Sequence, residues 1–192
     1  MRSPGAQAPG LFLFWMEHIM ELKRLTSAEH PLFARAMEGY GVSFPLHEQR
    51  ERDSQRAIMG HPEYHFDLIL EGEALLGCLL YWETGEFIYV EHFFILPEKR
   101  NGGCGAQALE LLAGKGKCVI LEIDPVVDEI SRRRKGFYER CGFVENPYPH
   151  VHPPYHAGNK GHSLVVMSCP EELSEELYQK FFHHLCHTVM GQ

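Results

Sequence analysis

The sequence predicts one domain of mixed α/β fold, in which strands and helices follow one another along the chain. Its 192 residues are 44% hydrophobic and 23% charged, a composition typical of a single globular domain. Short runs rich in apolar and aromatic residues alternate with segments whose apolar residues recur at helical spacing. Near the middle of the chain, a hydrophobic run leads into a glycine cluster and then a helical stretch, which is typical of a strand–turn–helix unit.

The first half of the chain predicts four strands and two helices. We expect strands at 20–26, 64–71, 74–82 and 86–96, a helix that includes residues 32–40, and a highly charged helix at 46–59. Thr26 or Ser27 can cap the first helix, and Gly60-His61-Pro62 can end the second. Glu71-Gly72-Glu73 predicts a turn between the second and third strands, so these two strands should form a hairpin.

The second half predicts three helices and three strands. We expect helices at 103–113, 128–141 and 171–189, and strands at 117–123, 142–145 and 162–168. Glu171 and Glu172 fall in the first turn of the last helix, where acidic side chains favour the helix dipole. We therefore divide the chain into a poorly ordered N-terminal extension at 1–18, a domain at 19–170, and a C-terminal helix at 171–192 that packs on the domain.

The stretch from Ile95 to Leu112, ILPEKRNGGCGAQALELL, predicts an anion-binding loop. A helix that begins after a tight glycine turn offers free backbone N–H groups and the positive end of its dipole, which together favour a phosphate group. Gly102, Gly103 and Gly105 carry no side chain, so the backbone can approach the anion closely. The ligand is therefore expected to be a nucleotide or a phosphorylated cofactor.

One motif in this loop points to a dinucleotide. Gly103, Gly105 and Ala108 satisfy the pattern G-x-G-x-x-G/A. Glu122 and Asp124 lie about 20 residues further on, where that pattern needs an acid for the ribose. A dinucleotide-binding oxidoreductase is therefore one interpretation of the sequence.

A second motif favours a different cofactor. Arg100, Gly103 and Gly105 satisfy Arg-x-x-Gly-x-Gly, which resembles the acetyl-CoA loop of the GCN5-related N-acetyltransferase (GNAT) family. Further along, Phe137-Tyr138 and Gly142-Phe143 form the string FYxxxGF, which resembles a segment of the same family at the same separation from the loop. Loop, strand, helix and FYxxxGF in this order favour the acetyltransferase over the oxidoreductase.

The resemblance implies a GNAT-like acyl-CoA N-acyltransferase fold over residues 20–168. Its sheet would be mixed and mostly antiparallel, with the order β-α-α-β-β-β-α-β-α-β-β, and the C-terminal helix would be an addition. The fourth and fifth strands would splay apart and hold the pantetheine arm of acetyl-CoA. The backbone of Phe93, Phe94 and Ile95 would then pair with that arm.

The resemblance also assigns the rest of the cofactor site. The residues expected around the cofactor phosphates are Arg100, Asn101, Gly102, Gly103, Cys104, Gly105 and Ala106. Ser131 and Arg134 stand where the family often has an asparagine and a small residue, and both are expected near the nucleotide end of the cofactor.

Acyl transfer from a thioester to an amine needs a base for the ammonium proton, a donor for the carbonyl oxyanion, and an acid for the departing thiolate. Tyr138 matches the family's tyrosine near the cofactor sulfur, so the resemblance makes it the acid. For the base we choose Glu91, a carboxylate in an otherwise apolar strand. In a regular strand its neighbour His92 would face the opposite side, although a bulge could bring both into one cleft. The acetyl group would pass directly to the amine.

The acceptor is expected to be a primary amine, either a small molecule or a peptide. The segment ENPYPHVHPPYHAGNKGH (145–162) would line the acceptor side in this fold, so His152, Tyr155 and His156 could recognise the amine. Glu51, on the charged helix at 46–59, would border the same pocket. His150 and His152 invite a metal interpretation, but no companion carboxylate or thiol stands at a telling spacing, so we expect no metal.

The composition argues against some classes of binding partner. The net charge of −8 argues against nonspecific binding to nucleic acid, and no apolar run approaches the roughly 18 residues that span a membrane. Six widely spaced cysteines without a C-x-x-C favour free thiols in a reducing cytoplasm. The sequence leaves open whether the protein forms a homodimer. It also leaves open a non-catalytic function, as a sensor module that binds acyl-CoA.

Overall fold

The computed structural model describes residues 19–191, and the expected extension at 1–18 lies outside this range. An open sheet in the order β1-β2-β3-β4-β5-β8-β6 runs through the molecule, and β7 pairs with β8 beside it. The strands are β1 (Met20–Leu25), β2 (Tyr64–Glu71), β3 (Ala74–Glu83), β4 (Phe87–Ile95), β5 (Cys118–Ile123), β6 (Val144–Glu145), β7 (His150–His152) and β8 (His162–Cys169). All pairings are antiparallel except that of β4 with β5, as the predicted fold requires.

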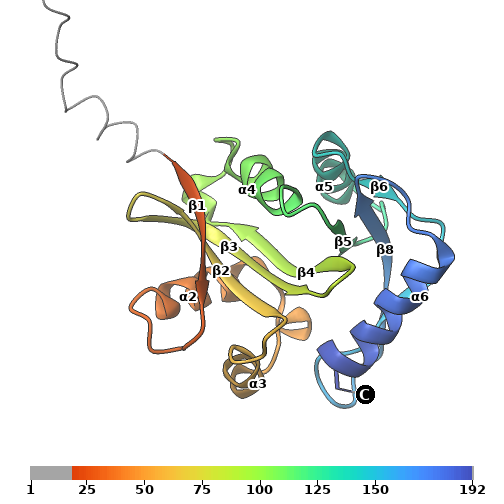
Figure 1. Cartoon of the computed structure of the whole chain (residues 1–192), viewed down its shortest axis with the longest axis horizontal. Coiled ribbons are helices and arrows are strands. Elements are labelled where there is room, and N and C mark those ends of the chain that lie inside the picture. Colours follow the sequence, from red (N-terminus) through yellow and green to blue (C-terminus); the bar gives the residue numbers. More distant parts are fainter. Residues whose placement is uncertain (1–18, 192) are drawn as a thin grey trace, which may run out of the picture.

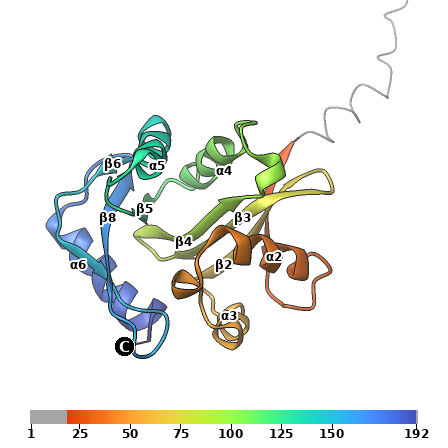
Figure 2. The ribbon, with the colours of Figure 1, turned by 180° about the vertical axis from the view of Figure 1, so that it is seen from behind.

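Helices cover both faces of the sheet (Figures 1 and 2). On one face lie α4 (Cys104–Ala113) and α5 (Glu129–Arg140), and on the other lie α2 (Phe33–Ser43), α3 (Arg52–Ile58) and α6 (Glu175–His184). A short 3-10 turn, η1 (Leu46–Glu48), lies between α2 and α3, and a π turn, η3 (Leu185–Val189), follows α6. Among the described residues, no helix is long and apolar enough to span a bilayer.

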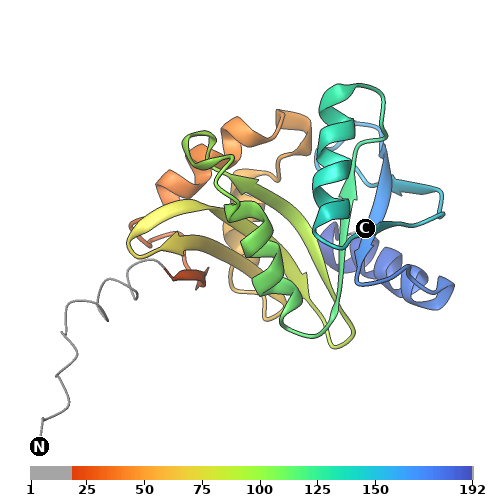
Figure 3. The same cartoon turned by 90° about the horizontal axis from the view of Figure 1, so that it is seen from above.

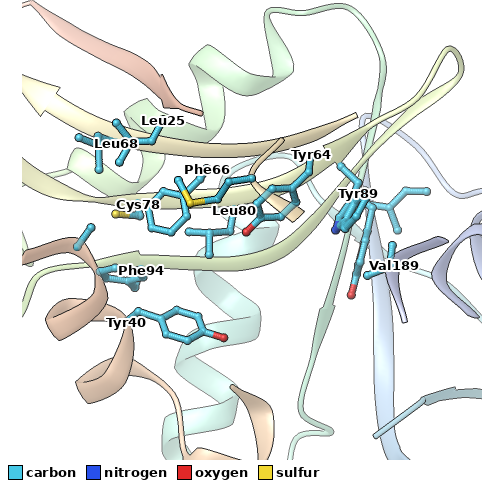
Figure 4. Packing of buried hydrophobic residues seen from close by; sticks show 14 of the residues in the cluster. Leu25, Tyr40, Tyr64, Phe66, Leu68, Cys78, Leu80, Tyr89, Phe94 and Val189 are labelled. Atoms are coloured by element: carbon cyan, nitrogen blue, oxygen red, sulfur yellow. The ribbon is translucent and has the colours of Figure 1, made fainter. Parts of the chain in front are cut away.

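Each face of the sheet has its own buried core because strand residues alternate between the two faces. On the α2 side, Tyr40 and Phe94 pack with Tyr64, Phe66 and other buried side chains of the central strands (Figure 4). The α6 segment belongs to this same core through its buried residues, which are Tyr178, Phe181, Leu185 and Val189. On the other side, Ala108, Leu109 and Leu112 seat α4 against the sheet.

The parallel strands β4 and β5 separate after a short paired stretch (Figure 3). They pair only from Phe87 to Val90 on β4, although β4 continues to Ile95. Across the other edge of β4, Leu80 lies opposite His92 and Tyr81 lies opposite Val90, so Glu91 is the extra residue of a β-bulge. A bulge bends its strand and increases the local twist, which accounts for the separation beginning there. The β5 side of residues 91–95 is left without a partner strand in the described chain.

Most predicted elements are present, but four differ in extent, one of them the expected strand at 142–145, which is only Val144–Glu145. The first helix begins at Phe33 without a side-chain cap, so the expected cap at Thr26 or Ser27 is wrong. Ser27 Oγ instead accepts a hydrogen bond from the Glu29 N–H in a local turn. The last helix begins at Glu175, after the capping residue Ser174, which places Glu171 and Glu172 before it.

The charged segment at 46–59 is not one helix. It divides into η1 and α3 because Gln49 and Arg50 make contacts that a continuous helix would not allow. The Gln49 side-chain amide donates to the Phe44 carbonyl at 2.7 Å, and the Arg50 N–H donates to the Tyr40 hydroxyl at 2.9 Å. The strand β7 was not predicted, because three residues with two histidines give no clear pattern.

Candidate active site

A cavity of about 1130 Å³ fills the space where β4 and β5 diverge. Its walls are the unpaired end of β4, the end of β5, the glycine loop, α5, and the segments around η1 and residues 152–164. The cavity therefore joins the two predicted halves of the site, with the cofactor loop at one end and the acceptor segment at the other.

The glycine loop has the conformation that an anion site needs. Gly103 is the N-cap residue of α4, with a φ of 79°, and no side chain of the described residues caps this helix end. The first amides of α4, at Cys104, Gly105 and Ala106, are therefore free to point at a ligand. Asn101 also has a positive φ, 67°, which asparagine tolerates better than most residues.

Gly105 has a second reason to be glycine. A Cβ at this position would lie 3.2 Å from Phe137 Cζ, so the Phe137 ring would have to shift by a few tenths of an ångström, whereas 3.5 Å to Phe93 Cζ is an ordinary contact. The glycine therefore allows a slightly closer approach of Phe137, in addition to the exposed backbone that the sequence predicts for the loop.

Most residues of the expected cofactor site line the cavity, but two do not. The lining includes Phe93, Phe94, Ile95, Arg100, Asn101, Gly103, Cys104, Gly105, Ala106 and Arg134. Gly102 and Ser131 lie outside it. Ser131 is instead the third residue of a capping box: its N–H and Oγ both bond to the Asp128 carboxylate, at 2.7 Å each. The Ser131 hydroxyl is therefore used to cap α5.

Tyr138 lies in the cavity wall on α5. Its ring is held between Phe137 and Phe143, with ring centroids 5.1 Å and 5.7 Å away. Burial raises the pKa of Tyr138 to about 12, so its phenol keeps its proton at neutral pH. A protonated phenol at this place can donate to a leaving thiolate.

Glu91 does line the cavity, but its carboxylate is already paired. Arg50 donates to Glu91 Oε1 from Nε at 3.1 Å and from a terminal nitrogen at 2.6 Å, and the Trp82 indole donates to Oε2 at 2.8 Å. Burial alone would raise the pKa of Glu91, but Arg50, His92 and Trp82 outweigh it and hold the pKa below its usual value. A carboxylate held as an anion in this way is a poor proton acceptor, so the geometry gives Glu91 a structural role.

A second buried carboxylate faces the cavity from β5. Glu122 accepts a hydrogen bond from the Tyr89 hydroxyl at 2.5 Å and pairs with His150 Nε2. His152 lies close by, with Nε2 3.9 Å from Glu122 Oε2. Burial raises the pKa of Glu122, but His152, His150 and Tyr89 together hold it below its usual value. This residue, considered above only for a ribose, is therefore the anionic centre of a histidine cluster.

The tautomer of His152 follows from its contacts. Nδ1 lies 2.5 Å from the Pro153 carbonyl oxygen, which can only accept, so Nδ1 carries the proton. Nε2 is therefore the nitrogen that can hold a lone pair, and it has no hydrogen-bond partner among the described residues. An imidazole nitrogen without a partner is a potential base.

His92 has a similar arrangement on β4. Because of the β-bulge at Glu91, the adjacent residues Glu91 and His92 do not face opposite sides of the sheet, and both line the cavity. Nε2 donates to the Glu48 carbonyl oxygen at 2.9 Å, which leaves Nδ1 with a lone pair and no partner among residues 19–191. Burial lowers the pKa of His92, so the ring is neutral near pH 7.

The structure brings only part of the expected acceptor site together. Tyr155 and His152 line the cavity, and their ring centroids are 5.0 Å apart. Glu51 and His156 do not line it. They bond to each other at the rim, with His156 Nδ1 2.8 Å from Glu51 Oε1, and this hydrogen bond raises the pKa of His156.

Arg50 is the residue that sequence reasoning missed. It appears in the sequence as one of several charges on a solvated helix face, yet it is only 9% exposed. Besides Glu91, it donates to the Val189 carbonyl oxygen at 2.9 Å and lies 5.7 Å from the Tyr155 ring centroid. Its position between Pro45 and the start of α3 carries no sequence pattern that would separate it from Arg52 or Arg56.

A mixed sheet whose two parallel strands diverge beside a glycine loop at a helix N-terminus defines a protein of the acyl-CoA N-acyltransferase class. The sequence profile described as "Acetyltransferase (GNAT) domain" matches residues 62–145. A solved structure from Bacteroides thetaiotaomicron, described as a "Putative acetyltransferase from GNAT family", is 30% identical. That alignment covers 90% of this chain and 99% of the other, with a TM-score of 0.84. This chain therefore belongs to the GNAT family of acetyltransferases.

Two further comparisons agree with the fold. "Putative acetyltransferase YjbC" of Bacillus subtilis is 26% identical over 102 residues, and this chain spans about half, 52%, of the length of that curated relative. Arabidopsis thaliana Naa50, solved with the bisubstrate analogue CoA-Ac-MVNAL, is 15% identical. Its alignment covers 78% of this chain and 97% of Naa50, with a TM-score of 0.54.

The fold also decides between the two cofactor motifs. A dinucleotide-binding domain needs a parallel sheet with its glycine loop after the first strand. Here the loop follows β4 of a mostly antiparallel sheet, and the acid expected at the ribose, Glu122, is buried against His150. The dinucleotide interpretation is therefore wrong.

Proposed function

We propose that this protein is an N-acetyltransferase that moves an acetyl group from acetyl-CoA to a primary amine, by direct attack of the amine on the thioester. The observation that carries the proposal is the cavity between β4 and β5, which joins the uncapped N-terminus of α4 to a cluster of buried histidines and carboxylates. The first feature suits a diphosphate, and the second suits an amine that must lose a proton.

The residues around the cavity support a division of tasks. The free amides at the start of α4, with Arg100, would hold the cofactor phosphates. The backbone of Phe93, Phe94 and Ile95 has no partner strand on the β5 side, where it would position the pantetheine arm and offer an N–H to the thioester oxygen. The Ile95 carbonyl already accepts a hydrogen bond from Arg100 Nε, at 3.0 Å. Tyr138 would then protonate the departing thiolate.

For the base, the geometry favours His152 over the predicted Glu91. His152 Nε2 has no hydrogen-bond partner in the described chain, and a proton taken there would be stabilised by Glu122, 3.9 Å away. His92 Nδ1 is likewise bare and lies 3.9 Å from Glu91 Oε1, but the Arg50 guanidinium already compensates that carboxylate. Glu122 has no arginine or lysine partner in the described chain, so its charge is available to an imidazolium.

The acceptor is proposed only as a class. Small-molecule and peptide amines both fit a cavity of this size, and the acidic groups around its acceptor end suit a cationic amine. The six cysteines are free thiols, which supports a reducing compartment such as the cytoplasm.

The proposal predicts that the protein releases free thiol from acetyl-CoA when the right amine is present. A panel of polyamines, aminoglycosides, amino acids and peptide N-termini, followed by thiol detection, would find the acceptor class. With that amine, Tyr138→Phe should lower kcat about 100-fold, in the range for loss of a general acid, while the Kd for coenzyme A stays unchanged.

Tyr148→Phe is the matched control, since Tyr148 donates to the Leu173 carbonyl away from the cavity. It should leave kcat within a factor of two of the wild type. Binding of coenzyme A without thiol release from any amine would contradict the transferase and favour the non-catalytic sensor. A Tyr138→Phe variant with full kcat would remove the tyrosine from the proposed chemistry.

A further inference from the structure

Three side chains of the types that bind metal ions meet in the wall of the cavity. His47 and Glu48 come from η1, and His162 is the first residue of β8. One potential ligand atom from each lies within 4.8 Å of the others. His47 Nε2 is 3.5 Å from Glu48 Oε1, and the rings of His47 and His162 are 6.2 Å apart between centroids.

The three residues lie on opposite arms of the diverging sheet. Glu48 is tied to β4, since its carbonyl accepts the hydrogen bond from His92. His162 is on β8, which pairs with β5. A ligand shared by these residues would therefore connect the β4 arm to the β5 arm across the entrance of the acceptor pocket.

The donor set suits a borderline divalent cation. Two imidazole nitrogens and one carboxylate oxygen are typical zinc ligands, and three protein ligands with a water in the fourth position form a common open site. Zinc bonds of about 2.0–2.2 Å require ligand atoms roughly 3.3 Å apart. The side chains of His47 and His162 are 59% and 41% exposed, so small rotations can close the remaining distance.

The local charge favours a cation as well. Asp124 Oδ1 lies 3.5 Å from His162 Nε2, so a second carboxylate borders the cluster. Arg134 offsets part of this charge by bonding to Asp124 at 2.6 Å.

We propose that this protein binds one zinc-like divalent cation through His47, Glu48 and His162, at the entrance of the acceptor pocket. The histidines that first suggest a metal in the sequence, His150 and His152, are engaged with Glu122 and Pro153 instead. Binding of the ion does not depend on the proposed transfer reaction. If that reaction is present, the ion should compete with the amine and leave acetyl-CoA binding unchanged.

The test is calorimetry with zinc chloride on the full chain, without a histidine tag and freed of metal. We expect one ion per chain with a micromolar Kd, weakened at least tenfold in both His162→Ala and Glu48→Gln. His183→Ala is the matched control, because His183 and His187 form another surface histidine pair, with centroids 4.3 Å apart, and neither lines the cavity. It should bind zinc as the wild type does.

Cobalt absorption separates this site from the six cysteines. Ligation by histidine and carboxylate should give d–d bands without the charge-transfer band that a thiolate ligand adds. No zinc binding at millimolar concentration, unchanged binding in His162→Ala and Glu48→Gln, loss of binding in His183→Ala, or a thiolate band would each overturn the proposal. Matching thermal unfolding of the variants shows that a lost site is not a lost fold.

Discussion

Arg50 and Glu91 form a buried ion pair beside the cavity. Both side chains are almost fully buried, at 7% and 1% exposure, and each has further polar partners. A buried ion pair contributes little net stability, but removal of one partner leaves an uncompensated charge away from water. Removal of either side chain of this pair should therefore destabilise the folded protein strongly.

Glu91→Gln should lower the free energy of unfolding in urea by about 3 kcal/mol at pH 7, since it leaves the Arg50 charge buried without its partner. Because the folded-state pKa of Glu91 is lowered, its contribution is complete above the ordinary pKa of 4.5 and is lost as the pH falls through the lowered value. The difference between wild type and variant should therefore shrink in acid.

Glu98→Gln provides the control for this measurement. Glu98 also pairs with an arginine, Arg35, but both side chains are 51% exposed. Its removal should change the free energy of unfolding by less than about 1 kcal/mol. Equal losses in the two variants would mean that burial of the Glu91 pair has no energetic consequence.

Residue-level prediction from the sequence is strongest where the backbone decides and weakest where tertiary contacts decide. The tight turn at Gly103 follows from local conformation and stands at the N-terminus of α4 as expected, whereas Gly102 does not line the cavity. The partner of Glu91 could not be found, because Arg50 is 41 positions away and has no distinguishing neighbours. Ser131 does not line the cavity for a local reason, since its hydroxyl donates to the Asp128 carboxylate in a capping box.

At the scale of elements, the N-terminus of α4 makes the next prediction. Gly103→Ala should raise the Kd for coenzyme A about tenfold, because a φ of 79° is strained for alanine and the loop amides would turn away. The same strain should cost roughly 1–2 kcal/mol of stability. Calorimetry with coenzyme A and urea unfolding measure the two effects.

Gly102→Ala is the comparison, one residue earlier in the same loop. Its backbone is not in the left-handed region, and an added Cβ would meet its nearest neighbour, Cys104 Sγ, at an ordinary 3.6 Å. Coenzyme A binding should stay close to that of the wild type. An equal loss of affinity in both variants would show that the left-handed turn at Gly103 is not what presents the amides.

The elements that the sequence predicts well are those with a strong local pattern. The hairpin of β2 and β3 and the strand β4 match their expected ranges within a residue. The division of 46–59 into η1 and α3 depends on hydrogen bonds to Phe44 and Tyr40, which lie on another element and leave no trace in hydrophobic periodicity. The short strand β7 exists only because β8 offers it an edge.

At the scale of the whole molecule, the C-terminal segment completes the core. Tyr178, Phe181 and Leu185 pack in the same buried cluster as Phe87 and Tyr89. A chain that ends at Ser174 should therefore lose its cooperative thermal transition, measured by circular dichroism. A chain that ends at Met190 keeps this packing and should unfold as the full chain does. A cooperative transition in the shorter chain would show that residues 19–170 fold as an independent domain.

The hydrogen bond from Arg50 to the Val189 carbonyl joins residues 139 positions apart. Because the acceptor is a backbone carbonyl, no change of the Val189 side chain removes it, and only the path of the chain after α6 decides whether Arg50 keeps this partner. The order of the Arg50 guanidinium, and with it that of its neighbours Glu91 and Tyr155, is thus coupled to the seating of residues 185–189 on the sheet.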